Sequence, residues 1–249
     1  MKTNGKKIFA AVAVLCLVVA LTALLVACTP KDRGGEGGGT GGGSGTSDGT
    51  VYTVNAPEGF LYDFGWKTTS ATAGSDAYVE VKPAFDAVVI DMVRANGKPC
   101  VNAGPAEDGG TRFEFVMPAE DVDITVERSF TDTERDGRIN WAKGMETAIS
   151  AGAGTATLTA EIGWPWTTSI KVPALLSTVE SVIPNDALSY EPVTNQDLVG
   201  SSGSNSIVQV RVEIDLGKVS PGETQIVLGL ESGNSSSNKG CIVVTVTVE

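Results

Sequence analysis

Apolar and polar residues alternate through most of the chain after residue 50, and this pattern limits what the chain can fold into. In "DVDITVE", residues 121–127, an apolar residue stands at every second position, with acids and threonine between. A period of two is typical of a strand with one buried face. The runs are separated by short pieces rich in Gly, Pro, Ser and Asn, which favour turns. The sequence therefore predicts an all-β protein.

The first folded unit is predicted over residues 51–130. The segments "AYVEVKP" (77–83), "AVVIDMVRA" (87–95) and "TRFEFVM" (111–117) are strand candidates. Asn96-Gly97 suits a type I′ turn, whose two central residues need positive φ. Pro118 has no N–H to donate to a ladder, so it should end one strand and start the corner of a hairpin with the next.

This unit resembles a known family. "AGSDAYVEVKPAFDAVVIDMVRANGKP" and "FEFVMPAEDVDITVERSF" are similar to the bacterial repeat family, the divergent internalin-type B-repeats of surface proteins. The resemblance implies a small β-rich spacer or adhesive module on a cell surface, and a single copy does not imply a long stalk. The matching residues are Gly74, Asp76, Pro83, Asn96-Gly97-Lys98, Met117-Pro118-Ala119, Asp121-Val122 and Phe130.

A second unit is predicted over residues 145–249. About seven short strand candidates separated by turns, in roughly 100 residues, suggest an immunoglobulin-like β-sandwich. The candidates are 155–162, 167–172, 177–183, 187–193, 207–216, 224–230 and 241–249.

The N-terminus indicates where the protein resides. Three lysines precede an uncharged stretch over residues 8–27, as in a secretory signal. "LLVAC" (24–28) resembles the lipobox of bacterial lipoprotein signal peptides, which implies that the segment 1–27 is removed and that Cys28 receives a lipid. The alternative is an uncleaved transmembrane helix with an incidental cysteine. We expect an extracytoplasmic protein anchored by its lipid to a bacterial cell membrane.

Glycine dominates residues 34–49, and the segment 28–50 should form a flexible tether between the lipid and the folded units. The net charge of −12 disfavours nucleic acid as a partner, because phosphate backbones are negative. The chain has no histidine, which excludes Ser-His-Asp and Cys-His mechanisms. We expect no enzymatic activity.

An acidic junction is predicted over residues 131–144. Its spacing resembles a calcium loop of the EF-hand or dockerin type, in which alternate acids converge on one ion. Lys143 stands where a carboxylate should close the site, so an acidic solvated linker is the alternative. No cofactor other than this Ca²⁺ is expected. The candidate ligands are Asp132, Glu134, Asp136 and Asn140.

Two further pairs of residues are candidate sites. Trp164 and Trp166 flank a proline in "GWPW" and could stack on sugar rings; alternatively one indole is core and the other caps a sandwich edge. Cys100 and Cys241 could form a disulfide between the two units outside the cytoplasm, or they could be two separate small apolar residues.

The expected function is that of a non-enzymatic, monomeric surface lipoprotein acting in adhesion, binding or spacing. Its partners would be the membrane, through the lipid, and a surface protein or a glycan. The alternative is a glycan- or peptide-binding accessory module of the cell envelope.

Overall fold

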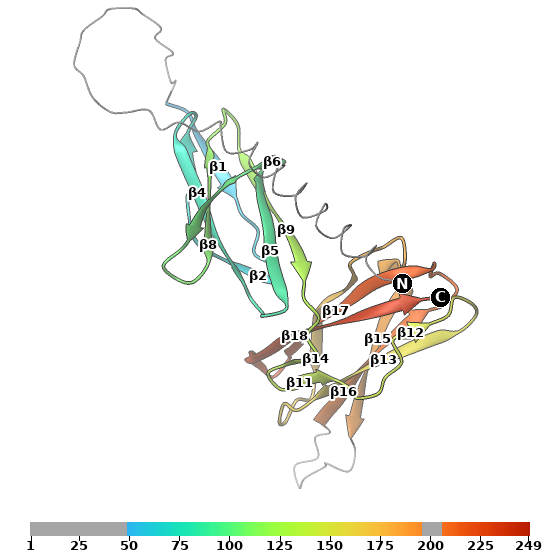
Figure 1. Ribbon diagram of the computed structural model, residues 1–249. Helices are drawn as coiled ribbons and strands as arrows, with labels where there is room; N and C mark the ends of the chain where they lie inside the picture. The colour runs from blue at the N-terminus through green and yellow to red at the C-terminus, as the bar shows by residue number, and fades with distance from the viewer. Residues whose placement is uncertain (1–48, 196–205) are drawn as a thin grey trace, which may run out of the picture. The chain divides into compact units, whose positions relative to one another are not determined.

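The computed structural model describes residues 49–195 and 206–249 (Figure 1). In these ranges every regular element is a strand except a short 3-10 turn, η1 (Asn185–Ala187), which confirms the all-β class. No helix in these ranges is long and apolar enough to cross a membrane. The predicted signal segment 1–27, Cys28 and nearly all of the predicted tether lie outside the described residues.

Strands β1 to β9 form a first sandwich of two sheets with a common core. The strand orders are β3-β1-β9-β5-β6 in one sheet and β2-β4-β8-β7 in the other. Valines and a few larger side chains from both sheets fill the core, because alternate positions of each strand point inward. The strands are β1 (Val51–Asn55), β2 (Tyr62–Lys67), β3 (Ser70–Thr72), β4 (Asp76–Pro83), β5 (Val88–Ala95), β6 (Lys98–Pro99), β7 (Val101–Pro105), β8 (Thr111–Val116) and β9 (Val122–Phe130).

The structure confirms the predicted turn at Asn96-Gly97 but not the predicted hairpin at Pro118. Asn96 and Gly97 have φ values of 47° and 75°, as the predicted turn requires. The predicted hairpin at Pro118 is wrong, because β8 and β9 lie in different sheets. The Asp121 carboxylate accepts the backbone N–H of Thr53 on β1 at 2.7 Å, so the corner carries the chain across to the other sheet.

Strands β10 to β18 form a second sandwich, with orders β10-β11-β13-β16-β15 and β12-β18-β17-β14. β11 and β12 follow one another in the chain but lie in different sheets: β11 pairs with β13, and β12 pairs in parallel with the last strand, β18. This is the arrangement of an immunoglobulin-like sandwich. The strands are β10 (Arg135–Asp136), β11 (Ile139–Trp141), β12 (Ala148–Ile149), β13 (Thr155–Ile162), β14 (Ile170–Ser177), β15 (Leu188–Asn195), β16 (Ser206–Asp215), β17 (Gly222–Ser232) and β18 (Ser235–Val248).

Two segments of the second sandwich differ from expectation. Residues 135–141, expected in the junction, contribute strands β10 and β11. Residues 178–183, expected in a strand, form turns instead. There the Thr224 hydroxyl bonds the Ser177 hydroxyl at 2.8 Å and accepts the Val179 N–H at 2.9 Å, which bends the chain away from the sheet. Ile183 is still fully buried, so its apolar character reflects the core.

Among the described residues, every edge strand of the four sheets is either very short or shifted in register against its neighbour. Four edge strands, β3, β6, β10 and β12, are two or three residues long. The longer edge strands are β2, β7, β14 and β15, and each has a shift of register against its neighbour.

A third apolar cluster contains side chains from both sets of strands. Leu61 and Phe85 belong to the first set, and Val227 and Cys241 to the second. Gly229 on β17 has no side chain where the Phe60 ring packs, and a Cβ atom there would lie 2.4 Å from a ring carbon.

Candidate binding groove

The chain crosses from one sheet of the first sandwich to the other between β6 and β7, and this crossing opens a groove. β6 pairs with β5 in one sheet, whereas β7 pairs with β8 in the other and reaches only as far as Val101, opposite Glu114. The next residues of β8, Phe115 and Val116, pair with β4 on one side. Among the described residues, no strand pairs with them on the other side.

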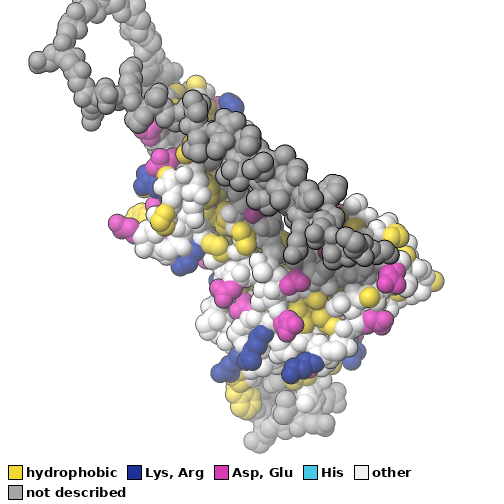
Figure 2. Space-filling view, viewed as in Figure 1, with side chains coloured by type: hydrophobic (Ala, Val, Ile, Leu, Met, Phe, Trp, Pro, Cys, Tyr) yellow, Lys and Arg dark blue, Asp and Glu magenta, His cyan; other side chains and the backbone are white. Residues whose placement is uncertain are grey.

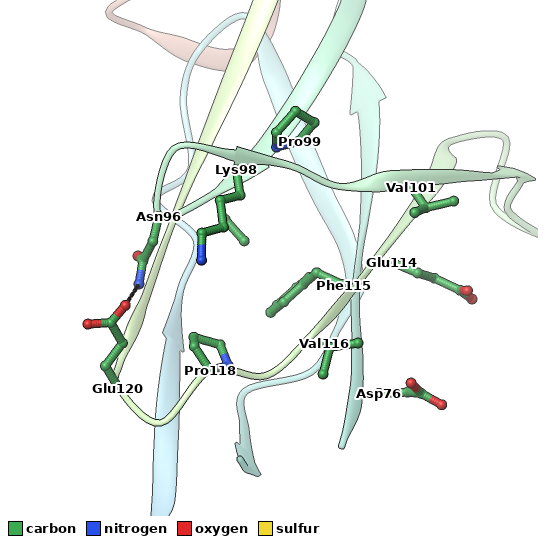
Figure 3. A pocket seen from close by; sticks show the side chains of 11 residues that line it. Asp76, Asn96, Lys98, Pro99, Val101, Glu114, Phe115, Val116, Pro118 and Glu120 are labelled. Carbon is green, nitrogen blue, oxygen red and sulfur yellow. Dashed lines mark hydrogen bonds between the residues drawn. The ribbon is translucent and has the colours of Figure 1, made fainter. Parts of the chain in front are cut away.

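The groove has a volume of about 420 Å³ and is mostly apolar. Figure 3 shows the Phe115 ring between the side chains of Lys98 and Pro118, with Pro99 on the strand that crosses. Val101 is 68% exposed and Val116 is 64% exposed. Exposed apolar side chains gathered in a hollow with a polar rim are typical of an interaction site.

Asn96 fixes one end of the groove. Its amide group donates to the backbone carbonyl of Asp121 at 2.9 Å and to the Glu120 carboxylate at 3.2 Å, and its side-chain oxygen accepts the N–H of Asp123 at 2.8 Å. Asn tolerates the positive φ of this turn better than most residues. The three bonds join the β5–β6 turn to the Pro118 corner, so this wall is held in place before any ligand binds.

The rim of the groove carries more acids than bases. Asp76, Glu114 and Glu120 line it, and Lys98 is the one base among the lining residues. Figure 3 shows the Asp76 and Glu114 carboxylates at the end of the groove opposite Asn96. Glu114 also accepts a hydrogen bond from Arg112 at 2.9 Å in an exposed pair. The rim therefore favours a ligand with basic groups.

The geometry suits an extended peptide better than a compact ligand. A segment lying beside Phe115 and Val116 would extend the sheet at the point where β7 leaves it. Main-chain hydrogen bonds then supply affinity, and side-chain pockets supply specificity.

The two tryptophans predicted as a sugar platform are not presented together. Trp164 is 5% exposed and belongs to the core of the second sandwich, whereas Trp166 is 66% exposed. Trp166 also has a φ of 60°, uncommon for a bulky residue. The pair therefore matches the alternative of one core indole and one at the surface.

The structure does not assemble the predicted calcium site. Asp132 accepts hydrogen bonds from Gln225 and Thr245, and Asp136 accepts one from the backbone N–H of Cys241. Asn140 donates to Glu161. Of the residues described, no three His, Cys, Asp or Glu side chains are grouped to hold a metal. Asp136 and Asn140 instead lie in the β10–β11 hairpin, because the chain pairs with itself around Gly137.

Cys100 and Cys241 are both free thiols. Cys100 is partly buried beside the first core, and Cys241 is fully buried in the third cluster, so they lie in different clusters. Burial raises the pKa of the Cys100 thiol. Burial, with the nearby Asp136 charge, raises the pKa of Cys241 to about 12. The predicted disulfide is not formed.

The groove itself was missed in the sequence, although one signal for it was present. Phe113, Phe115 and Met117 alternate as the inward face of β8, which leaves Val116 as an apolar residue on the outward face. A strand that is apolar at an outward position next to a proline is a candidate for contact with a partner.

No protein-family model matches the chain, and no curated protein matches it. The resemblance to the bacterial repeats rests on the residues quoted above.

Proposed function

We propose that the protein is a non-enzymatic surface lipoprotein that binds an extended segment of a partner protein in the groove of its first sandwich. The observation that carries this proposal is the open side of β8 at Phe115 and Val116. It supplies the backbone groups of Val116, which face away from β4, together with exposed apolar side chains at one place. The acidic rim indicates that the segment contains lysine or arginine beside its apolar residues.

The membrane part of the proposal rests on "LLVAC", residues 24–28. A lipid on Cys28 followed by a glycine-rich tether would hold the groove away from the bilayer on the outside of the cell. Metabolic labelling with a fatty-acid probe tests this step: the wild type should be labelled, and Cys28→Ala should not. Equal labelling of the variant would remove the anchor from the proposal.

A selection from a library of extended ten-residue peptides, with the full chain in detergent as bait, tests the groove. Selected peptides should be apolar and basic. Val116→Glu should weaken their binding about tenfold or more, because it places a charge against the apolar floor. Val89→Glu is the matched control, since Val89 is an exposed valine of the same sandwich that does not line the groove.

Backbone methylation distinguishes strand addition from simple apolar contact. Methyl groups on the amides of one edge of a selected peptide should abolish binding, and methyl groups on the other edge should be tolerated. Peptides that bind Val116→Glu as well as the wild type would contradict the groove. Equal tolerance of methylation on both edges would contradict strand addition.

A further inference from the structure

The course of β7 limits how a strand can lie in the groove of the first sandwich. A ligand strand beside Val116 would continue the line of β7, because both lie on the same side of β8. β7 begins at Val101, opposite Glu114. The residue before it, Cys100, donates its backbone N–H to the carbonyl of Val93 on β5, in the other sheet, at 2.9 Å. The protein's own chain therefore closes the groove at this end, and a strand bound along β8 has to end there or leave the sheet.

Val116 is the residue of β8 that offers free backbone groups to such a strand. The next residue, Met117, exchanges backbone hydrogen bonds with Ser75 and Gly74, just before β4, at 2.9 and 2.8 Å. Successive residues of a strand direct their backbone groups to opposite sides, so the N–H and C=O of Val116 point away from β4. Val116 stands two residues beyond Glu114, where β7 begins. Two strand residues span about 7 Å, which leaves room for one ligand residue between the start of β7 and the position opposite Val116.

The closed end of the groove is acidic. Figure 3 shows the carboxylates of Glu114 and Asp76 at this end. Arg112 donates to one oxygen of Glu114, Oε1, at 2.9 Å, and the other oxygen accepts no hydrogen bond from a described residue. Asp76 is exposed and forms no ion pair within the described ranges. A carboxylate of a ligand would be repelled at this end, whereas an ammonium group would be attracted.

We infer that the groove holds the N-terminal end of a partner chain, with its free α-ammonium group beside Glu114. The inference rests on the proposed function and names the part of the partner that the groove recognises. The partner runs parallel to β8, from the closed end toward Pro118. A C-terminal end would have to run antiparallel to β8, and it would bring a carboxylate to the acids. Capture of a terminal amine is an established mode of peptide recognition.

Three synthetic forms of one peptide test the inference. A ten-residue apolar and basic peptide, selected on the full chain in detergent with its N-terminus free, is made with a free amine, with an acetylated amine, and with one glycine added before its first residue. Fluorescence anisotropy of the peptide, labelled at its C-terminus, measures Kd. Acetylation should weaken binding about tenfold, because it removes the charge that the acids attract. The added glycine should weaken binding as well, because the closed end has no room for a further residue.

Glu114→Gln gives a second readout. This variant should weaken binding of the free-amine peptide by about fivefold and leave binding of the acetylated peptide unchanged, since the contact is an ion pair at the surface. Asp63→Asn is the matched control, because Asp63 is an exposed acid of the same sheet that does not line the groove. It should change neither Kd.

The outcomes separate this inference from the proposed function. Equal binding of the free and acetylated peptides, both still weakened by Val116→Glu, would overturn the inference and leave the groove in place. If no selected peptide depends on Val116, the proposed function and the inference both fail. Equal weakening of the two peptides by Glu114→Gln would overturn the contact between Glu114 and the amine.

Discussion

In both sandwiches the chain passes from one sheet to the other between two neighbouring strands, but different residues lie at the two crossings. In the first sandwich the crossing from β6 to β7 leaves Val101 and Val116 exposed. In the second, the crossing from β11 to β12 begins after Trp141, whose large side chain is buried in the core. A crossing between sheets therefore leaves apolar side chains exposed in the first sandwich and follows a buried indole in the second.

The cores of the two sandwiches differ in the size of their buried side chains. Fully buried side chains of the second sandwich are mostly Ile and Leu, whereas Val predominates in the first. The second sandwich also buries Trp141 and Trp164, and Trp66 of the first is 76% exposed. The buried side chains are therefore larger in the second sandwich, although Trp166 of that sandwich is exposed as Trp66 is.

The largest expected loss of stability comes from removing a buried indole. Trp164→Ala should lower the free energy of unfolding by about 3–5 kcal/mol, since it empties a large volume in the core. Trp66→Ala in the first sandwich should change it by less than about 0.5 kcal/mol, because that side chain is already in water. Urea unfolding of both variants measures the difference. Similar costs would mean that Trp66 is packed in solution, and the contrast between the sandwiches would fail.

A smaller loss of stability is expected when an aliphatic core side chain is shortened to alanine. Leu228 and Val93 are both fully buried, one in each sandwich. Leu228→Ala should cost about 2–5 kcal/mol. Val93→Ala should cost about 1.5 kcal/mol or slightly more, because it removes fewer carbon atoms. The exposed Val89→Ala serves as the surface reference, and a cost of Val93→Ala above that of Leu228→Ala would contradict the difference between the cores.

A substitution in the third apolar cluster, at Gly229, tests whether the two sets of strands share a core. Gly229→Ala would place a Cβ atom 2.4 Å from a carbon of the Phe60 ring, so one of the two must move. We expect a cost of about 1–3 kcal/mol in urea unfolding. Gly152→Ala is the matched control, since nothing lies within 4 Å of the added atom. Adding Phe60→Leu to Gly229→Ala should recover part of the loss; a neutral Gly229→Ala would show that the ring does not pack there.

The last prediction concerns how the free energy of unfolding depends on pH. Burial raises the pKa of the Cys241 thiol from 9.0 to about 12, so the folded state keeps a proton that the unfolded chain loses. This contribution to stability is complete below pH 9 and decreases as the pH rises toward 12. The slope approaches about 1.4 kcal/mol per pH unit.

Unfolding of Cys241→Ala and Cys100→Ala between pH 8 and pH 11 measures this slope. Cys241→Ala should flatten the dependence, and Cys100→Ala should retain most of it. An identical pH dependence in the wild type and in Cys241→Ala would contradict the assigned burial.

Local patterns in the sequence predicted most of the strands. The alternation in 77–83 and 121–127 identified β4 and β9, and Asn96-Gly97 identified its turn, because these features depend on a few neighbouring residues. The partners of β8 and β9 could not be predicted in this way. β8 pairs with β4, and β9 pairs with β5 and β1, so these pairings join residues far apart in the chain.

The candidate sites were harder to predict for the same reason. Acids at alternate positions in 132–136 matched a calcium loop, but in the fold Asp132 and Asp136 bond to groups on β17 and β18. The groove exists because β7 leaves β8 at Val101, which no local pattern reveals.

The edges of the sheets have a consequence for what happens when many copies of this protein meet. Strand edges are where identical chains most readily join into continuous fibres, and short or bulged edges prevent such joining. Every edge strand described here is very short or interrupted in its register. Many copies could therefore stand close together without polymerising, while the brief open stretch of β8 still admits a single visiting strand.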